Sequence, residues 1–313
     1  METVHFFYGT ARKHTRFPPG RVVVLRDDLT HGILHRDRLL SQRLRCGYLG
    51  EPLADVDRVL EAVRPLGIAD EVVVWHGPRP AEQMLLAWLV PWLSGELTRC
   101  SVRLALATDP QSEPLPAEGA TSQDLLRGYM SRRSVDAKVD ALLVRLWEAV
   151  TAETPAALQA VSDKELWALP LWVNARTALL SRYPDATGLN FHDRVLLGQC
   201  SLRWRGAGRV LSGTVKNAAT VAPLSDRAAW RRLQRLMGES GEESALVEVR
   251  CAGPFVPGEC DVRLTPLGVD AVQGIVDVLE YLPLTDWIGG VLLQSPDRIW
   301  RWTDFGLVRD EQD

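Results

Sequence analysis

The sequence predicts two domains: an α/β domain over residues 1–115 with a short, mostly parallel sheet, and a mainly α-helical domain over residues 116–313. Two observations predict this division. Short apolar runs that end near a glycine recur along the N-terminal part, which is typical of buried parallel strands. Beyond residues 109–121, which are rich in acids and prolines and which we interpret as an exposed linker, the apolar residues take helical spacing.

Residues 21–25 form the run around which we expect the sheet to be organised. The run is too continuous for a half-exposed strand and too short for a helix, so it predicts a central strand that is covered on both faces. It is followed by Asp27, Asp28 and His31. Ligands of open α/β sheets bind beyond the carboxyl ends of the strands, which is where these side chains would lie. The alternative is that either aspartate only caps a turn or a helix.

Residues 4–8 and 71–75 repeat this pattern, and residues 102–107 form a fourth strand. The first run ends at Gly9 and Thr10, and the second ends at His76 and a glycine. If these strands are parallel neighbours, their carboxyl ends converge on one rim. The candidate catalytic residues are Asp28, His76 and Asp27, and the candidate ligand-binding residues are Gly9, Thr10, His31, Glu82 and Gln83.

Helices should cover the sheet. Residues 36–48 and 55–63 have apolar residues at helical spacing, and we interpret the arginines at positions 36, 38, 43 and 45 as a solvated face from which one side chain can reach the rim. A proline turn after the third strand leads into a further helix with Glu82 and Gln83 in its first turn. That helix end either binds an anion or is only capped by these two residues.

The C-terminal part has two helical stripes, over residues 135–150 and 166–180, and we expect the tryptophans at 147, 167 and 172 to lie in its core. Asn190 is a plausible helix cap. An arginine-rich helix over residues 226–237, two strands and a capped helix resemble a winged-helix unit. Acids at positions 239, 242, 243 and 248 would repel phosphates, so we favour a packing module over a DNA reader.

Composition limits the classes of function. The chain has 313 residues, 46% of them hydrophobic, and a formal net charge of −4, which argues against broad nonspecific nucleic-acid binding but not against a local basic face in the C-terminal half. The start of the chain does not resemble a signal peptide, and the apolar run over 84–93 is shorter than the roughly 20 residues of a membrane span. We therefore expect a cytoplasmic protein without a membrane segment. Five cysteines without a CxxC pair predict reduced thiols, with Cys251 and Cys260 as packed neighbours across a hairpin.

Several motifs in order resemble a known family. In the N-terminal part they are Arg26-Asp27-Asp28-Leu29-x-x-Gly32, Val74-Trp75-x-Gly77 and Glu82-Gln83-x-Leu-Leu86. In the C-terminal part they are Leu169-Pro-Leu, Tyr183-Pro-x-x-x-Gly188-Leu, Leu264-Thr-x-x-Gly268, Trp287-Ile-Gly-Gly-Val-x-Leu and Trp300-Arg-Trp302. Together they are similar to the bacterial domain-of-unknown-function family 1835. The resemblance implies a Rossmann-like N-terminal domain and no particular activity.

The leading hypothesis is a protein that binds a small polar or anionic ligand at the strand ends. Hydrolase- or transferase-like chemistry extends it, with Asp28 acting as a base or orienting His76. A metal held by Asp28, His31 and His76 is a variant of this hypothesis. The sequence names no cofactor, and it lacks the glycine-rich motifs of classical NAD and ATP sites. The alternative is a regulatory or scaffold protein whose winged-helix-like module contacts DNA or a protein partner.

Overall fold

The structure is a computed structural model that describes residues 2–9, 16–50, 52–97, 99–219, 221–238, 244–303 and 305–310. The chain forms two compact units. The first consists of Met1–Arg176 with Trp287–Val291, and the second of Thr177–Asp286 with Leu292–Asp313. Residues 116–176, which the sequence analysis assigned to the second domain, are therefore part of the first compact unit.

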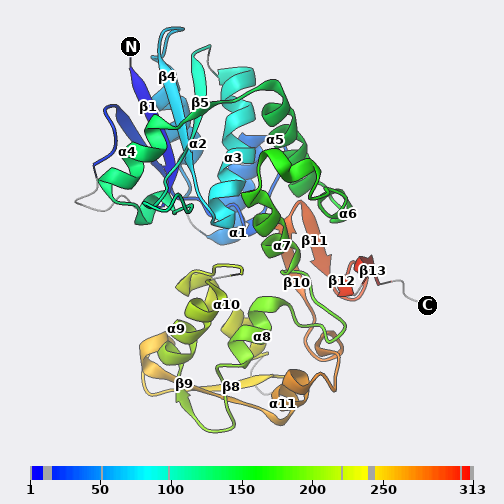
Figure 1. The fold of residues 1–313 in the computed structure, drawn as a ribbon. Coiled ribbons are helices and arrows are strands. Elements are labelled where there is room, and N and C mark those ends of the chain that lie inside the picture. Colours follow the sequence, from blue (N-terminus) through cyan, green and yellow to red (C-terminus); the bar gives the residue numbers. More distant parts are fainter. Residues whose placement is uncertain are drawn as a thin grey trace. The chain divides into compact units, whose positions relative to one another are not determined.

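The first unit is built on a five-stranded, mostly parallel sheet, as predicted (Figure 1). Its strands, in spatial order, are β2 (Arg21–Leu25), β1 (Thr3–Tyr8), β4 (Glu71–His76), β5 (Ser101–Leu106) and β6 (Arg133–Ser134). The first four are parallel to their neighbours, and β6 runs antiparallel to β5. The four predicted strands and their parallel pairing are thus confirmed.

Strand β2 is an edge strand, so the prediction that it is central and covered on both faces is wrong. Its only neighbour in the sheet among the described residues is β1, and Val22 is 36% exposed. Strand β4, by contrast, is buried along its whole length. A continuous apolar run identifies a strand, but it does not say which side of the strand another strand will occupy.

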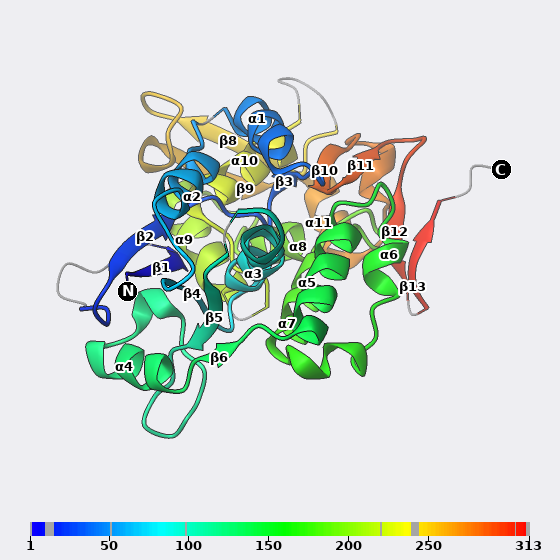
Figure 2. The ribbon, with the colours of Figure 1, turned by 90° about the horizontal axis from the view of Figure 1, so that it is seen from above.

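Helices cover both faces of this sheet. Figure 2 shows α2 (Asp55–Val63) and α3 (Pro80–Trp92) on one side and α4 (Ser122–Met130) on the other. On the α4 side, Leu125 packs with Phe7 and Trp75. Residues 109–121 are not simply a linker, because Ala117 and Ala120 belong to the same buried cluster.

Helix α1 (Arg38–Leu49) buries the face that was expected to be exposed and exposes the face that was expected to be buried. Arg45 is 1% exposed and Ser41 is 2% exposed, whereas Leu39 and Leu44 are 48% and 38% exposed. Arg38 is half-buried and donates from Nε to the Trp88 carbonyl at 2.8 Å. The prediction of a solvated arginine face is therefore wrong for Arg38 and Arg45, which contact the protein interior because they satisfy backbone and carboxylate acceptors there.

The first unit is completed by helices that follow the sheet in the chain. They are α5 (Ala137–Val150), α6 (Ala156–Gln159) and the start of α7 (Leu171–Leu180). Trp147 and Trp172 lie in the core as predicted, but Trp167 is 86% exposed.

Strand β3 (Gly32–Ile33) pairs in parallel with Ile288 and Gly289 of β10 (Thr285–Gly289).

The second unit is mixed α/β rather than mainly α. In chain order its elements include α8 (Phe191–Leu197), β7 (Arg205–Gly206), α9 (Ala207–Ala218), α10 (Asp226–Leu236), β8 (Val247–Cys251), β9 (Cys260–Leu264) and α11 (Pro266–Gln273). The three strands form an antiparallel sheet in the order β7-β9-β8. Strand β11 (Val291–Gln294) and the antiparallel hairpin of β12 (Trp300–Thr303) and β13 (Gly306–Arg309) follow in the chain.

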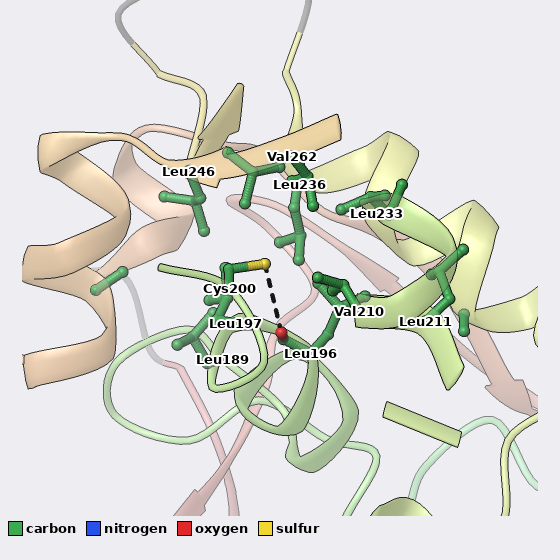
Figure 3. Close-up of a cluster of buried hydrophobic side chains, with 14 of the residues drawn as sticks. Leu189, Leu196, Leu197, Cys200, Val210, Leu211, Leu233, Leu236, Leu246 and Val262 are labelled. Atoms are coloured by element: carbon green, nitrogen blue, oxygen red, sulfur yellow. Dashed lines mark hydrogen bonds between the residues drawn. The ribbon is translucent and has the colours of Figure 1, made fainter. Parts of the chain in front are cut away.

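An apolar cluster joins α8, α9, α10, β8, β9 and α11 of the second unit (Figure 3). Leu196 and Leu233 are fully buried in it, from α8 and α10, with Val262 from β9. The Cys200 thiol donates to the Leu196 carbonyl at 3.6 Å within the cluster. Cys251 and Cys260 are joined by a disulfide, so the prediction that this pair is reduced is wrong in this structure.

A buried ion-pair cluster connects α8 to α10. Asn190 caps α8 as predicted, accepting from the Asp193 N–H at 3.0 Å. The Asp193 carboxylate, 1% exposed, accepts from Arg232 at 3.0 Å and from Arg235 at 2.6 Å. Burial opposes this charge, but the two guanidinium groups outweigh it and lower the pKa of Asp193. Two arginines of the arginine-rich helix are therefore used inside the unit.

Candidate functional site

Asp27 holds an internal arginine at the end of β2. Its two carboxylate oxygens accept from Nη2 and Nε of Arg45 at 2.6 and 2.8 Å. Arg45 also donates to the carbonyls of Asp28, His31 and Ile33 at 3.0, 2.5 and 3.2 Å. Arg45 is thus the arginine that reaches the rim, and it organises the whole turn between β2 and β3.

Asp28 closes a local turn. Its Oδ1 accepts from the backbone N–H and the hydroxyl of Thr30 at 3.0 and 2.6 Å, and its Oδ2 lies 3.3 Å from Nδ1 of His31. Burial by itself raises the pKa of Asp28, but the charge of His31 and the hydrogen bonds from His31 and Thr30 bring it well below its usual range. These contacts are those of the turn-capping alternative, and they stabilise the ionised carboxylate.

Tyr8 lies close to both aspartates, although the sequence analysis did not single it out. Burial and the charges of Asp28 and Asp27 raise its pKa, so the phenol keeps its proton at neutral pH. The adjacent Gly9 has a φ of 123°, and its N–H donates to the Leu25 carbonyl at 3.0 Å. Thr10 lies outside the described residues.

Glu82 is an internal capping residue at the start of α3. Its carboxylate accepts from the Arg79 N–H and the Ala117 N–H, both at 3.1 Å, and the residue is 1% exposed. Burial outweighs these hydrogen bonds and raises the pKa of Glu82 to about 7. A Cβ at the position of Gly77 would lie 2.5 Å from Oε2 of Glu82, so a larger residue there would displace the capping carboxylate.

His76 and Gln83 face a cavity of about 300 Å³ at the carboxyl ends of β4 and β5. The cavity lies within the first unit, and most of its wall is apolar. Its lining residues are His76, Gln83, Leu104, Leu106, Thr108, Ser131, Arg133, Leu169, Pro170 and Leu171. The structure therefore places two of the eight candidate residues, His76 and Gln83, in one cavity. It adds polar side chains that the sequence had not linked to the strand ends, among them Ser131 and Arg133.

The polar groups of the cavity are arranged around a neutral imidazole. Burial, with a contribution from the Arg133 charge, lowers the pKa of His76 to about 3. Gln83 donates from Nε2 to the Gly77 carbonyl at 2.6 Å, and the same nitrogen lies 3.4 Å from Nδ1 of His76. If that nitrogen donates, Nδ1 is the acceptor and the ring proton is on Nε2. Arg133 is exposed, with one guanidinium nitrogen 3.0 Å from the Ala168 carbonyl.

The sequence contained a partial signal for this cavity. The fourth strand was expected over residues 102–107, and β5 ends at Leu106, which brings Thr108 to the cavity just beyond it. Leu169-Pro-Leu carried a signal only as a motif of the family resemblance. Arg133 and Ser131 gave no signal, because they reach the site only through the antiparallel pairing of β6 with β5.

The proposed metal site does not form. In the described part of the chain, no three His, Cys, Asp or Glu side chains are grouped so that they could hold a metal ion, and this includes Asp28, His31 and His76. The same ranges contain no helix that is both long and apolar enough to cross a membrane. Neither family models nor curated proteins match this chain.

Proposed function

We propose that the first unit binds a small molecule with an anionic group and an apolar body in the cavity at the ends of β4 and β5. The observation that carries this proposal is the meeting, in one hollow of about 300 Å³, of an exposed guanidinium, a buried amide and a buried neutral imidazole with leucine walls. Small-molecule sites typically combine a mostly apolar concave wall with a few convergent polar groups.

Each side chain has a distinct role in this proposal. Arg133 pairs with the carboxylate or phosphate of the ligand, since a guanidinium offers parallel donors to both groups. Gln83 and His76 orient a second polar atom, because both are held by the local structure. Leu104 and Leu171 contact the apolar body of the ligand.

Hydrolase- or transferase-like chemistry would be a second step after binding. An imidazole whose pKa is near 3 is a hydrogen-bonding group rather than a strong base at neutral pH. Asp28 is engaged by Thr30 and His31, so it would act on a ligand only as a preorganised, ionised carboxylate.

The first test is native mass spectrometry of the purified chain, followed by a thermal-shift screen of small carboxylates and phosphate esters. Arg133→Gln should weaken binding of a hit by at least about tenfold, the loss expected when one charge-assisted hydrogen bond is removed. Arg99→Gln is the matched control, because Arg99 is an exposed arginine just before the amino end of β5, away from the cavity. Equal affinities of the two variants would contradict the proposal.

A pH profile tests the state of His76. Because its pKa is about 3, affinity should be constant from pH 5 to 8 for a ligand that does not titrate in that range. A transition near pH 6.5 that is absent in His76→Asn would show that His76 titrates normally and would contradict the arrangement around it.

The alternative function concerns the second unit. The order helix, strand, helix, helix and two-stranded hairpin, with a β7-β9-β8 sheet, supports a winged-helix-like module. Arg232 and Arg235 pair with Asp193, and Arg250 and Arg263 pair with acids on the neighbouring strand, which favours a protein partner over DNA. Under this alternative the protein is a regulator or scaffold.

Salt dependence of duplex-DNA binding separates the two forms of this alternative. A DNA reader would show affinity that falls steeply with salt and falls again in Arg231→Ala. Weak binding to every duplex, with an affinity that does not change with salt, would favour a protein partner.

Membership of domain-of-unknown-function family 1835 stays a prediction from the sequence motifs, and the parallel N-terminal sheet agrees with what that resemblance implies.

A further inference from the structure

The outer edge of β2 offers backbone groups for pairing. In the described ranges β2 is hydrogen-bonded to β1 alone. The Leu25 carbonyl accepts from Gly9 of the chain that continues β1, so the backbone groups of Leu25 point toward β1. Backbone groups alternate in direction along a strand, so those of Val22 and Val24 point away from β1. Just past the strand, the N–H groups of Arg26 and Asp27 both donate to Asp55 of α2 at 2.7 Å, so α2 begins beside the end of β2.

A groove of about 340 Å³ runs along this edge beside α2. Its lining residues are Arg21, Val22, Val23, Val24, Arg26, Arg58, Glu61 and Ala62. Its three valines favour strand structure, and all three are at least partly exposed in the groove. An edge strand with a helix alongside is the geometry in which an extended peptide can add a strand to a sheet.

The charge of the groove selects among possible occupants. Three arginines and one glutamate line it. Arg21 contacts Glu2 and Arg58 contacts Asp55, but both guanidinium side chains are still about two-fifths exposed, at 42% and 40%. A second copy of the chain on this edge would bring the same arginines face to face, and like charges across paired strands are destabilising.

We propose that this β2 groove, formed by the outer edge of β2 and α2, binds an extended acidic peptide segment of a partner protein, which adds a strand to the sheet. Backbone hydrogen bonds to Val22 and Val24 supply affinity. The arginines at the two ends of the strand and on α2 select acidic side chains.

The test uses the full-length protein and a labelled peptide with blocked ends and the sequence Glu-Val-Thr-Val-Thr-Asp, with a Lys-for-acid peptide as the charge control. Val22→Pro removes one outward N–H and leaves the β1 pairing intact, and proline is tolerated on edge strands. Val22→Thr keeps the N–H and is the matched control. Arg26→Glu tests charge, with the exposed Arg43→Glu on α1 as its control.

The expected result is binding of the acidic peptide and not of the lysine peptide, with affinity that falls as salt rises. Val22→Pro and Arg26→Glu should each weaken it by about tenfold or more, while both controls bind as the wild type does. Equal binding by Val22→Pro and Val22→Thr would overturn the proposal. So would a concentration-dependent dimer that Val22→Pro dissociates, because the edge would then belong to a second copy. The cavity ligand plays no part in these measurements.

Discussion

Removing the carboxylate of Asp27 should lower the free energy of unfolding of the first unit much more than a substitution in a loop usually does. The substitution Asp27→Ala leaves the Arg45 guanidinium, 1% exposed, without its carboxylate partner. Two charge-assisted hydrogen bonds, at 2.6 and 2.8 Å, are lost. Breaking a buried pair by removing one partner typically costs about 3–5 kcal/mol. We expect the lower part of this range, because Arg45 keeps its contacts to backbone carbonyls.

The assay is urea denaturation of the full-length chain followed by tryptophan fluorescence, with thermal unfolding in parallel. A loss of about 3 kcal/mol corresponds to roughly 6–12 °C in the melting temperature for a unit of this size. Arg43→Ala is the matched control, because Arg43 is an exposed arginine of the same helix and should change stability by less than about 0.5 kcal/mol. A change below about 1 kcal/mol for Asp27→Ala would refute the reasoning that the pair is buried and unreplaced.

Three further predictions test other buried groups. The pKa of Glu82 is raised from 4.5 to about 7, so its contribution to stability is fully present below pH 4.5 and is lost as the pH rises to 7, by about 3 kcal/mol in all. Denaturation at several pH values should show this slope in the wild type and not in Glu82→Gln; parallel curves would contradict it. Asp193→Ala leaves two partly buried arginines of the second unit without their carboxylate partner and should cost about 3 kcal/mol, the lower end of the range for a broken buried pair, whereas a change within 1 kcal/mol would mean that the cluster is open to water. Trp172→Ala should cost about 3–5 kcal/mol, and Trp167→Ala, at an 86% exposed position, should cost almost nothing; similar losses would show that both are core residues.

The four parallel strands of the first sheet and the Asn190 cap were predictable because their signals are local. The continuous apolar run over residues 71–75 forms a strand that is buried along its length, and Asn190 satisfies a backbone N–H three residues away. The candidate site was predictable only in part. His76 and Gln83 line the cavity, but Asp27, Asp28 and Glu82 are used to hold turns and a helix end.

Helix α1 shows why hydrophobic spacing alone was misleading. The rule that leucines face the core assumes that the core offers only apolar contacts. Here the neighbouring turn presents the carboxylate of Asp27 and several carbonyls, and Arg45 is the side chain that can satisfy them together. The leucines of α1 consequently lie on its exposed side.

The sequence by itself determined the four parallel strands of the first sheet and the cap of α8 at Asn190, since each depends on interactions within a few residues or on a repeated pattern. Only the tertiary structure decided that β2 lies at the edge of the sheet, that Arg45 points inward, and that Arg133 joins His76 at one cavity. These features depend on which elements become neighbours, and that choice is made by the burial and hydrogen bonding of the whole unit at once.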